Sequence, residues 1–237
     1  MTIYGLLFGL KDFVNIADYM KLNEEYFTEL LGLENGTPSH DCLSDLFARI
    51  DYKKFMNIFI KWTEELLKSK NGKNISIDGK AIKSATDKVN NGNIPYIVSS
   101  FIGEIGLSIG QVKFDDKSNE ITAIPDILDL IDIEGATITI DAIGTQFEIA
   151  KKMVFNGGHY VLKVKKNQAE LLKQIKSQFN FYNNLYGNSE VLYKKTIEKD
   201  HERGEIREYF LTYNTSKIKD KEKWGGCKSY RVCKSNN

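Results

Sequence analysis

The feature that most constrains the fold is a change of pattern near residue 70, from helical spacing to strands that alternate with helices. Before this point, apolar residues recur at intervals of three and four, which is typical of amphipathic helices. The clearest of these runs consists of Phe55, Ile58, Phe59, Trp62 and Leu66. Ser39 and Asp51 each precede a helical run and are residue types that cap helix N-termini. Residues 1–70 are therefore predicted to form a small helical domain.

Residues 71–237 are predicted to form a second domain. Its expected elements, in chain order, are a strand ending at Asp78-Gly79, a hairpin of 96–102 and 107–114, a helix over 121–130, a strand over 136–141, a helix over 147–155, a strand over 159–164, a helix over 168–179, and strands over 192–197 and 206–213. An antiparallel pair followed by alternating strands and helices indicates an α/β fold with a mixed sheet flanked by helices. No element is assigned firmly after Tyr213.

Two of the predicted strands end in an aspartate that a small residue follows, in Ile77-Asp78-Gly79 and Ile140-Asp141-Ala142. Open α/β sheets place their sites at the carboxyl ends of strands. If these two strands are neighbours, about 4.8 Å separates them, and a divalent cation would relieve the repulsion between the carboxylates. Such a pair can support in-line displacement at phosphorus. The alternative is that Asp78 and Asp141 only cap turns, as strand-terminal aspartates commonly do.

Charge is distributed unevenly along the chain. Residues 1–150 hold 14 Lys and Arg against 23 Asp and Glu, a net charge of −9, whereas residues 151–237 hold 19 against 9, a net charge of +10. The basic half favours a phosphate-binding face, and a solvated lysine-rich surface is the alternative. Cys42, Cys227 and Cys233 form no close pairs, which argues against a disulfide framework and favours a reducing cytoplasm. No stretch reaches the roughly 18–20 apolar residues that a membrane span needs.

Several motifs follow one another in a recognisable order. Residues 74–84 are Asn-Ile-Ser-Ile-Asp-Gly-Lys-Ala-Ile-Lys-Ser, and residues 139–150 are Thr-Ile-Asp-Ala-Ile-Gly-Thr-Gln-Phe-Glu-Ile-Ala. Residues 157–168 are Gly-Gly-His-Tyr-Val-Leu-Lys-Val-Lys-Lys-Asn-Gln. Together with residues 33–41 and 117–125, these motifs resemble ISAs-type insertion-sequence DDE transposases over about residues 3–213. The sequence departs from the family pattern at Lys83, where arginine is usual, and at Lys166, where glycine is usual.

The resemblance implies an RNase H-like sheet in which the strands ending at Asp78 and Asp141 are neighbours. It implies that these residues are the first two acids of the catalytic triad and that they bind Mg²⁺ or Mn²⁺. The implied activity is cleavage and joining of DNA phosphodiesters, with insertion-sequence ends and target DNA as partners and a DNA-associated, cytoplasmic location. No membrane partner is expected.

The resemblance also suggests where DNA binds. Lys165 is suited to contacting phosphate as a point charge, although a solvated surface lysine is the alternative. Residues 201–207, His-Glu-Arg-Gly-Glu-Ile-Arg, are similar to the family's His-Gly-Arg-x-Glu-x-Arg segment. The expected DNA contacts are Lys165, Asn167, Gln168, His201 and Arg203.

The third acid of the family lies in a His-Trp-x-Ile-Glu-Asn pattern that this sequence does not contain. Glu205 matches a glutamate of the 201–207 segment, but there a local ion pair is favoured over a catalytic role. We therefore expect a chain truncated at its C-terminus and at its N-terminus, with apolar surface open to self-association. Three functions stay open: an incomplete or inactive transposase, a non-catalytic protein that binds DNA or a partner, and a structural protein whose aspartates only cap turns.

Overall fold

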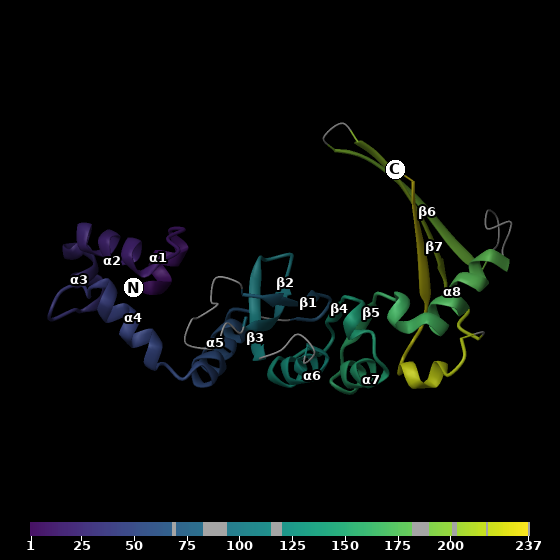
Figure 1. The fold of residues 1–237 in the computed structure, drawn as a ribbon, viewed down its shortest axis with the longest axis horizontal. Coiled ribbons are helices and arrows are strands. Elements are labelled where there is room, and N and C mark those ends of the chain that lie inside the picture. The colour runs from purple at the N-terminus through teal and green to yellow at the C-terminus, as the bar shows by residue number, and fades with distance from the viewer. Residues whose placement is uncertain are drawn as a thin grey trace. The chain divides into compact units, whose positions relative to one another are not determined.

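The computed structural model describes residues 1–67, 70–82, 94–114, 120–181, 190–200, 203–216 and 218–236. The chain divides into two compact units, Met1–Met56 and Asn57–Asn237 (Figure 1). The domain boundary expected near residue 70 stays a prediction.

The first unit is helical, as its apolar spacing predicts. It contains α1 (Thr2–Leu7), α2 (Phe13–Leu22), α3 (Glu24–Leu31) and α4 (His40–Arg49). Its core is built from residues on the inner faces of α2, α3 and α4, namely Ile16, Ala17, Met20, Phe27 and Leu43. The Ser39 side chain accepts a hydrogen bond from the main-chain N–H of Cys42, so the predicted cap of α4 is confirmed.

Helix α5 (Tyr52–Leu66) spans the boundary between the units. The side chain of Asp51 accepts hydrogen bonds from the main-chain N–H groups of Lys53 and Lys54, which confirms it as the N-terminal cap. The expected apolar face of this helix is largely exposed, since Ile58 and Trp62 keep 68% and 46% of their surface accessible.

A mixed five-stranded sheet forms the centre of the second unit, with strand order β3-β2-β1-β4-β5. Strands β1 (Asn74–Ala81), β2 (Tyr96–Ile102) and β3 (Leu107–Phe114) are antiparallel, whereas β1, β4 (Thr137–Ile140) and β5 (His159–Leu162) are parallel. This order, with helices between the parallel strands, is that of an RNase H-like fold. The fold class expected from the sequence is therefore confirmed.

Helices α6 (Glu120–Leu130) and α7 (Phe147–Phe155) pack against one face of this sheet (Figure 1). Burial alternates along β1 and β4, because successive side chains of a strand point to opposite faces. The buried set includes Ile75, Ile77, Ile138 and Ile140, which form one core with Ile127 and Met153. The opposite face of β1 carries Ser76 and Asp78, which are both exposed.

A second sheet has the order β6-β7-β8, from β6 (Val191–Asp200), β7 (Arg203–Thr212) and β8 (Tyr230–Asn236). Helix α8 (Ala169–Phe181) packs on it through a separate core that contains Ile175, Phe179 and Phe210. The segment between β7 and β8 includes the 3₁₀ turn η6 (Lys221–Trp224) and packs against α7, where the rings of Trp224 and Phe147 lie 4.3 Å apart.

Several elements differ from the sequence-based expectations: β5 ends at Leu162 instead of 164, β6 extends beyond the expected 192–197, and β7 covers Arg203–Thr212 instead of 206–213. Strand β1 continues to Ala81 instead of ending at Asp78-Gly79, because β2 pairs with it from Ile75 to Ala81. The 3₁₀ turn η5 (Lys166–Gln168) precedes α8, which begins at Ala169. Strand β8 was not expected, because its polar and basic residues lack a clear apolar alternation.

Candidate metal centre

Asp78 and Asp141 each directly follow the last paired residues of the parallel β1–β4 ladder. The register pairs Ile77 with Ile140; Asp78 is the next residue of β1, and Asp141 is the first residue after β4. Neighbouring strands lie about 4.8 Å apart, and both side chains are exposed. The strand adjacency that the resemblance implies is therefore present. Asp78 itself still pairs with Ser99 of β2, since only the pairing with β4 stops at Ile77.

The chain turns sharply directly after Asp141. This residue is the N-cap of η4 (Ala142–Gly144), a 3₁₀ turn that leads toward α7. The adjacent main-chain N–H of Ala142, assisted by the Lys165 ammonium, holds the pKa of the Asp141 carboxyl below its ordinary value, against the opposing effect of partial burial. The electrostatics thus favour the ionised carboxylate, which is the form that binds a cation.

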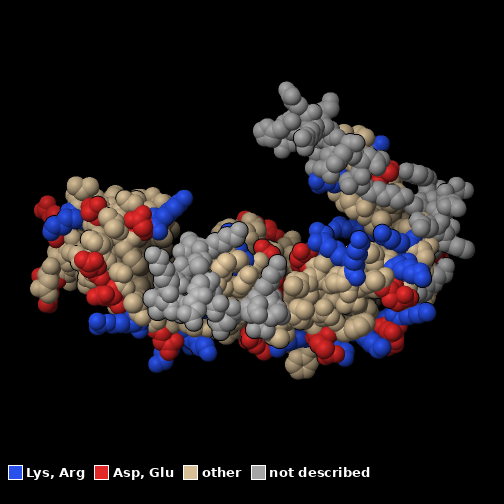
Figure 2. Space-filling view, viewed as in Figure 1, with Lys and Arg blue, Asp and Glu red and all other residues tan. Residues whose placement is uncertain are grey.

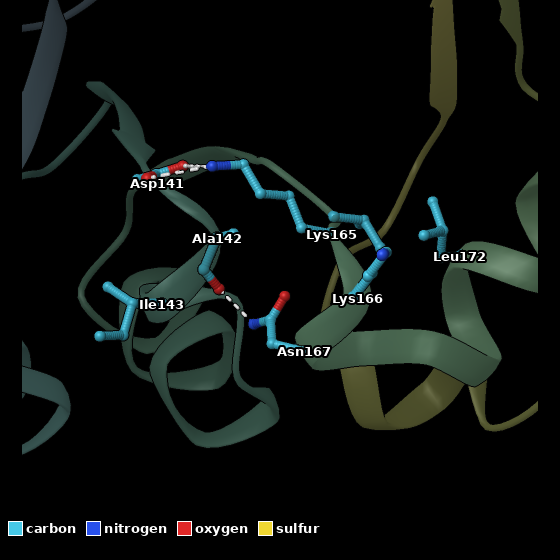
Figure 3. A pocket seen from close by; sticks show the side chains of 8 residues that line it. Asp141, Ala142, Ile143, Lys165, Lys166, Asn167 and Leu172 are labelled. Atoms are coloured by element: carbon cyan, nitrogen blue, oxygen red, sulfur yellow. Dashed lines mark hydrogen bonds and ion pairs between the residues drawn. The ribbon is translucent and has the colours of Figure 1, made fainter.

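Lys165 is the basic residue in contact with this carboxylate. Its Nζ lies 3.3 Å from Oδ1 and 3.4 Å from Oδ2 of Asp141. Figure 3 shows its side chain extending to Asp141, whereas the side chain of Lys166 points away from it. Both members of the pair are about half exposed, so the pair is accessible to solvent and to a ligand.

The turn that carries Lys165 is held against the turn after Asp141 by side-chain amides. Asn167 donates from Nδ2 to the main-chain carbonyl of Ala142, and Gln168 donates from Nε2 to that of Thr145 across 2.9 Å. The buried Thr145 hydroxyl donates in turn to the carbonyl of Lys163. In this structure Asn167 and Gln168 therefore position the two turns, and their expected DNA contacts stay a prediction.

An open hollow of about 690 Å³ adjoins the site. The residues that line it are Asp141, Ala142, Ile143, Val164, Lys165, Lys166, Asn167 and Leu172. Figure 2 shows Lys and Arg side chains gathered on the surface over β5 and the start of α8. A negatively charged ligand that enters the hollow therefore meets a carboxylate on one side and ammonium groups on the other.

All five expected DNA contacts stay predictions, and for two of them the structure describes no side chain. His201 lies outside the described residues, and Arg203 is described only as a backbone position of β7. Among the described residues, no group of three or more His, Cys, Asp and Glu side chains could hold a metal ion.

Thr145 and Gly144 are site residues that the sequence reasoning did not identify. A Cβ atom on Gly144 would overlap the Ile140 side chain and would lie 3.1 Å from Cδ1 of Ile124, so glycine is needed for this close approach. The available signal was the Gly-Thr pair three and four residues after Asp141, where a glycine indicates a turn or a close approach of the chain.

Comparison with known proteins decides the family. Residues 96–227 match the family described as "Transposase DDE domain", and residues 1–63 match the family described as "DDE_Tnp_1-associated". The chain belongs to the DDE transposase family. Among its relatives is "Putative transposase YncI" of Escherichia coli K12, which is 34% identical over 92% of this chain and 87% of its own length.

Other relatives of this DDE transposase chain are longer. "Putative protein YbfL" of Escherichia coli K12 is 36% identical over 87% of this chain and 54% of its own length. The chain thus spans little more than half the length of the first curated relatives it matches. A piggyBac transposase synaptic complex with hairpin DNA aligns with 62% of this chain and 31% of that chain, at 10% identity and a TM-score of 0.34, a likeness too slight to carry an argument. No helix within the described ranges is long and apolar enough to cross a bilayer.

Proposed function

We propose that this chain carries the DNA-cleaving and DNA-joining site of a DDE transposase, with Asp78 and Asp141 as ligands of a divalent cation. The observation that carries the proposal is the parallel β1–β4 register, in which Ile77 pairs with Ile140 and an aspartate directly follows each of them. Membership of the DDE transposase family supports the same reading. The proposed substrates are the ends of an insertion sequence and a target DNA.

The donor set fits Mg²⁺ or Mn²⁺. Both side chains are exposed carboxylates on neighbouring strands, and these ions favour hard oxygen ligands. Mg²⁺ is commonly held by one or two carboxylates, with waters and substrate phosphate oxygens completing its coordination. A bound cation would polarise the phosphodiester and activate the attacking hydroxyl or water.

The basic residues of the hollow are suited to the DNA backbone. Lys165 and Lys166 are exposed and line the same hollow as Asp141, so their ammonium groups can neutralise a phosphate next to the carboxylates. Asn167 and Gln168 would act on the reaction by keeping η5 fixed against the loop after Asp141. A fixed geometry contributes to rate because the reacting groups need no further ordering.

A second candidate function is DNA binding without cleavage. It is favoured by the same basic surface (Figure 2) and needs no metal. In a third reading, Asp141 only stabilises the turn that follows it. This reading rests on the attraction between the Asp141 carboxylate and the main-chain N–H of Ala142. Metal binding and phosphodiester cleavage separate these three readings.

The decisive experiment is a Mn²⁺ titration followed by calorimetry or electron paramagnetic resonance. We expect saturable binding in the unmodified chain that is weakened at least tenfold in Asp78→Asn and in Asp141→Asn. Asp126→Asn, which changes an exposed carboxylate on α6, is the matched control and should bind as the unmodified chain does. Equal binding in all four proteins would exclude the carboxylate pair as the metal site.

A plasmid assay then separates cleavage from binding alone. Nicking of supercoiled DNA that requires Mg²⁺ or Mn²⁺ and is lost in Asp78→Asn supports the transposase site. DNA binding that weakens steeply with salt but produces no nicks supports the non-catalytic candidate. Loss of one phosphate contact in Lys165→Gln should reduce the slope of log affinity against log salt by about 1.

A further inference from the structure

One cation is already in place at the proposed metal centre. The Lys165 ammonium lies within 3.4 Å of both carboxylate oxygens of Asp141. A metal ion bound by this carboxylate would occupy the same region, since Mg²⁺ coordinates an oxygen at about 2.1 Å. Two cations that close to one carboxylate repel each other, so the contact and the metal ion compete.

The Lys165 side chain can move away from Asp141 while the backbone of Lys165 stays in place. Asn167 and Gln168 fix the turn next to Lys165 through bonds to the carbonyls of Ala142 and Thr145. The lysine side chain itself is half exposed, and solvent-exposed ion pairs are weak. Rotation of the long side chain therefore requires no unfolding, and the ammonium stays beside the hollow where a phosphate would lie (Figure 3).

We propose that Lys165 is an internal counter-ion of Asp141 that keeps the metal centre closed and exchanges with the divalent cation when the site is loaded. This inference rests on the proposed function and adds a regulatory step to the same site. In the metal-free protein Lys165 neutralises Asp141. After the exchange, the freed ammonium binds DNA phosphate, so that metal binding and backbone binding favour each other.

The test uses three glutamine variants, each of which removes one positive charge. Lys165→Gln removes the competing cation. We expect this variant to bind Mn²⁺ about threefold to fivefold more tightly than the unmodified chain, which is the upper part of the range for an exposed ion pair. Lys166→Gln removes the adjacent, exposed ammonium that points away from Asp141 (Figure 3). Lys163→Gln removes a charge that acts on the Asp141 carboxylate by Coulombic attraction. Both controls should change the affinity by less than about twofold.

A second readout follows Lys165 directly. Amine acetylation by a water-soluble ester, quantified by peptide mass spectrometry, should be faster at Lys165 when Mn²⁺ is present, because the ammonium is then released from the carboxylate. The rate at Lys166 should stay the same. Lys165→Arg keeps the charge and should bind Mn²⁺ no more tightly than the unmodified chain.

The outcomes separate the two ideas. If neither the unmodified chain nor Lys165→Gln binds Mn²⁺, the metal centre itself is wrong. A second outcome overturns the exchange alone. In that case the unmodified chain binds Mn²⁺ through Asp78 and Asp141, but Lys165→Gln has the same Mn²⁺ affinity as Lys163→Gln. The acetylation rate at Lys165 is then also the same with and without Mn²⁺. Tighter binding in Lys165→Gln together with metal-dependent acetylation supports it.

Discussion

The buried hydroxyl of Thr145 donates a 2.8 Å hydrogen bond to the main-chain carbonyl of Lys163. This bond ties the loop that follows Asp141 to the chain leaving β5, and so links the carboxylate to the turn that carries Lys165. Thr145 has no accessible surface. The pairing of β4 with β5 alone ends at Leu162, so the hydroxyl extends the connection beyond the sheet.

Thr145→Val keeps the side-chain shape and removes this donor. We expect the free energy of unfolding to fall by about 1–3 kcal/mol, the cost of leaving a carbonyl without its partner. Urea unfolding followed by circular dichroism measures it. An unchanged midpoint would mean that the hydroxyl does not hold the two turns together.

Gly144→Ala should disturb the same loop by crowding. The added Cβ would overlap the Ile140 side chain directly before Asp141, and we expect a loss of about 1–3 kcal/mol of stability together with weaker Mn²⁺ binding. Gly103→Ala is the matched control, because no atom lies within 4 Å of a Cβ at that position. Similar stability of the two variants, measured by thermal unfolding, would contradict the close approach at Gly144.

Local patterns were enough to predict elements whose signals are contained in a short stretch. The hairpin strands 96–102 and 107–114 and the helix 147–155 have the expected bounds, because apolar alternation or helical spacing ends at clear turn residues on both sides. By contrast, β1 extends past Asp78 because β2 pairs with it. That extension depends on a partner strand, which the alternation around Ile75 and Ile77 does not reveal.

The metal-binding role of the two aspartates stays a prediction, and the contacts around them could not be predicted from the sequence. A strand-terminal aspartate is visible in the sequence, whereas the adjacency of Asp78 and Asp141 depends on the parallel register of β1 and β4. Motif resemblance implied that adjacency, and periodicity alone did not. The contact of Lys165 with Asp141 joins residues on either side of α7 and β5, so it requires the turns after both strands to be in place.

Substitution of the two tryptophans is expected to lower the free energy of unfolding by very different amounts. Trp224 is 4% exposed and packs on Phe147 at the start of α7, whereas Trp62 is 46% exposed. Trp224→Ala should lower the free energy of unfolding by about 3–5 kcal/mol, and Trp62→Ala by less than about 1 kcal/mol. Denaturant unfolding followed by circular dichroism compares them. Equal effects would mean that η6 is not docked on α7.

The thiol of Cys227 follows this docked segment and should report on it. Burial raises the pKa of the Cys227 thiol, and a main-chain hydrogen bond from Ser229 offsets only part of this effect. Because the thiolate is the reactive form, a raised pKa leaves less of it at pH 8. We therefore expect iodoacetamide to modify Cys227 more slowly than the exposed Cys42 and Cys233.

Peptide mass spectrometry of a time course measures the three rates, and their pH dependence provides the check. The sign is fixed by the raised pKa: the increase in the Cys227 rate should begin at higher pH than that of Cys42. In urea, where burial is lost, the three rates should converge. If native Cys227 reacts as fast as Cys42, the segment after Trp224 must open readily. That result would also contradict the large loss of stability expected for Trp224→Ala.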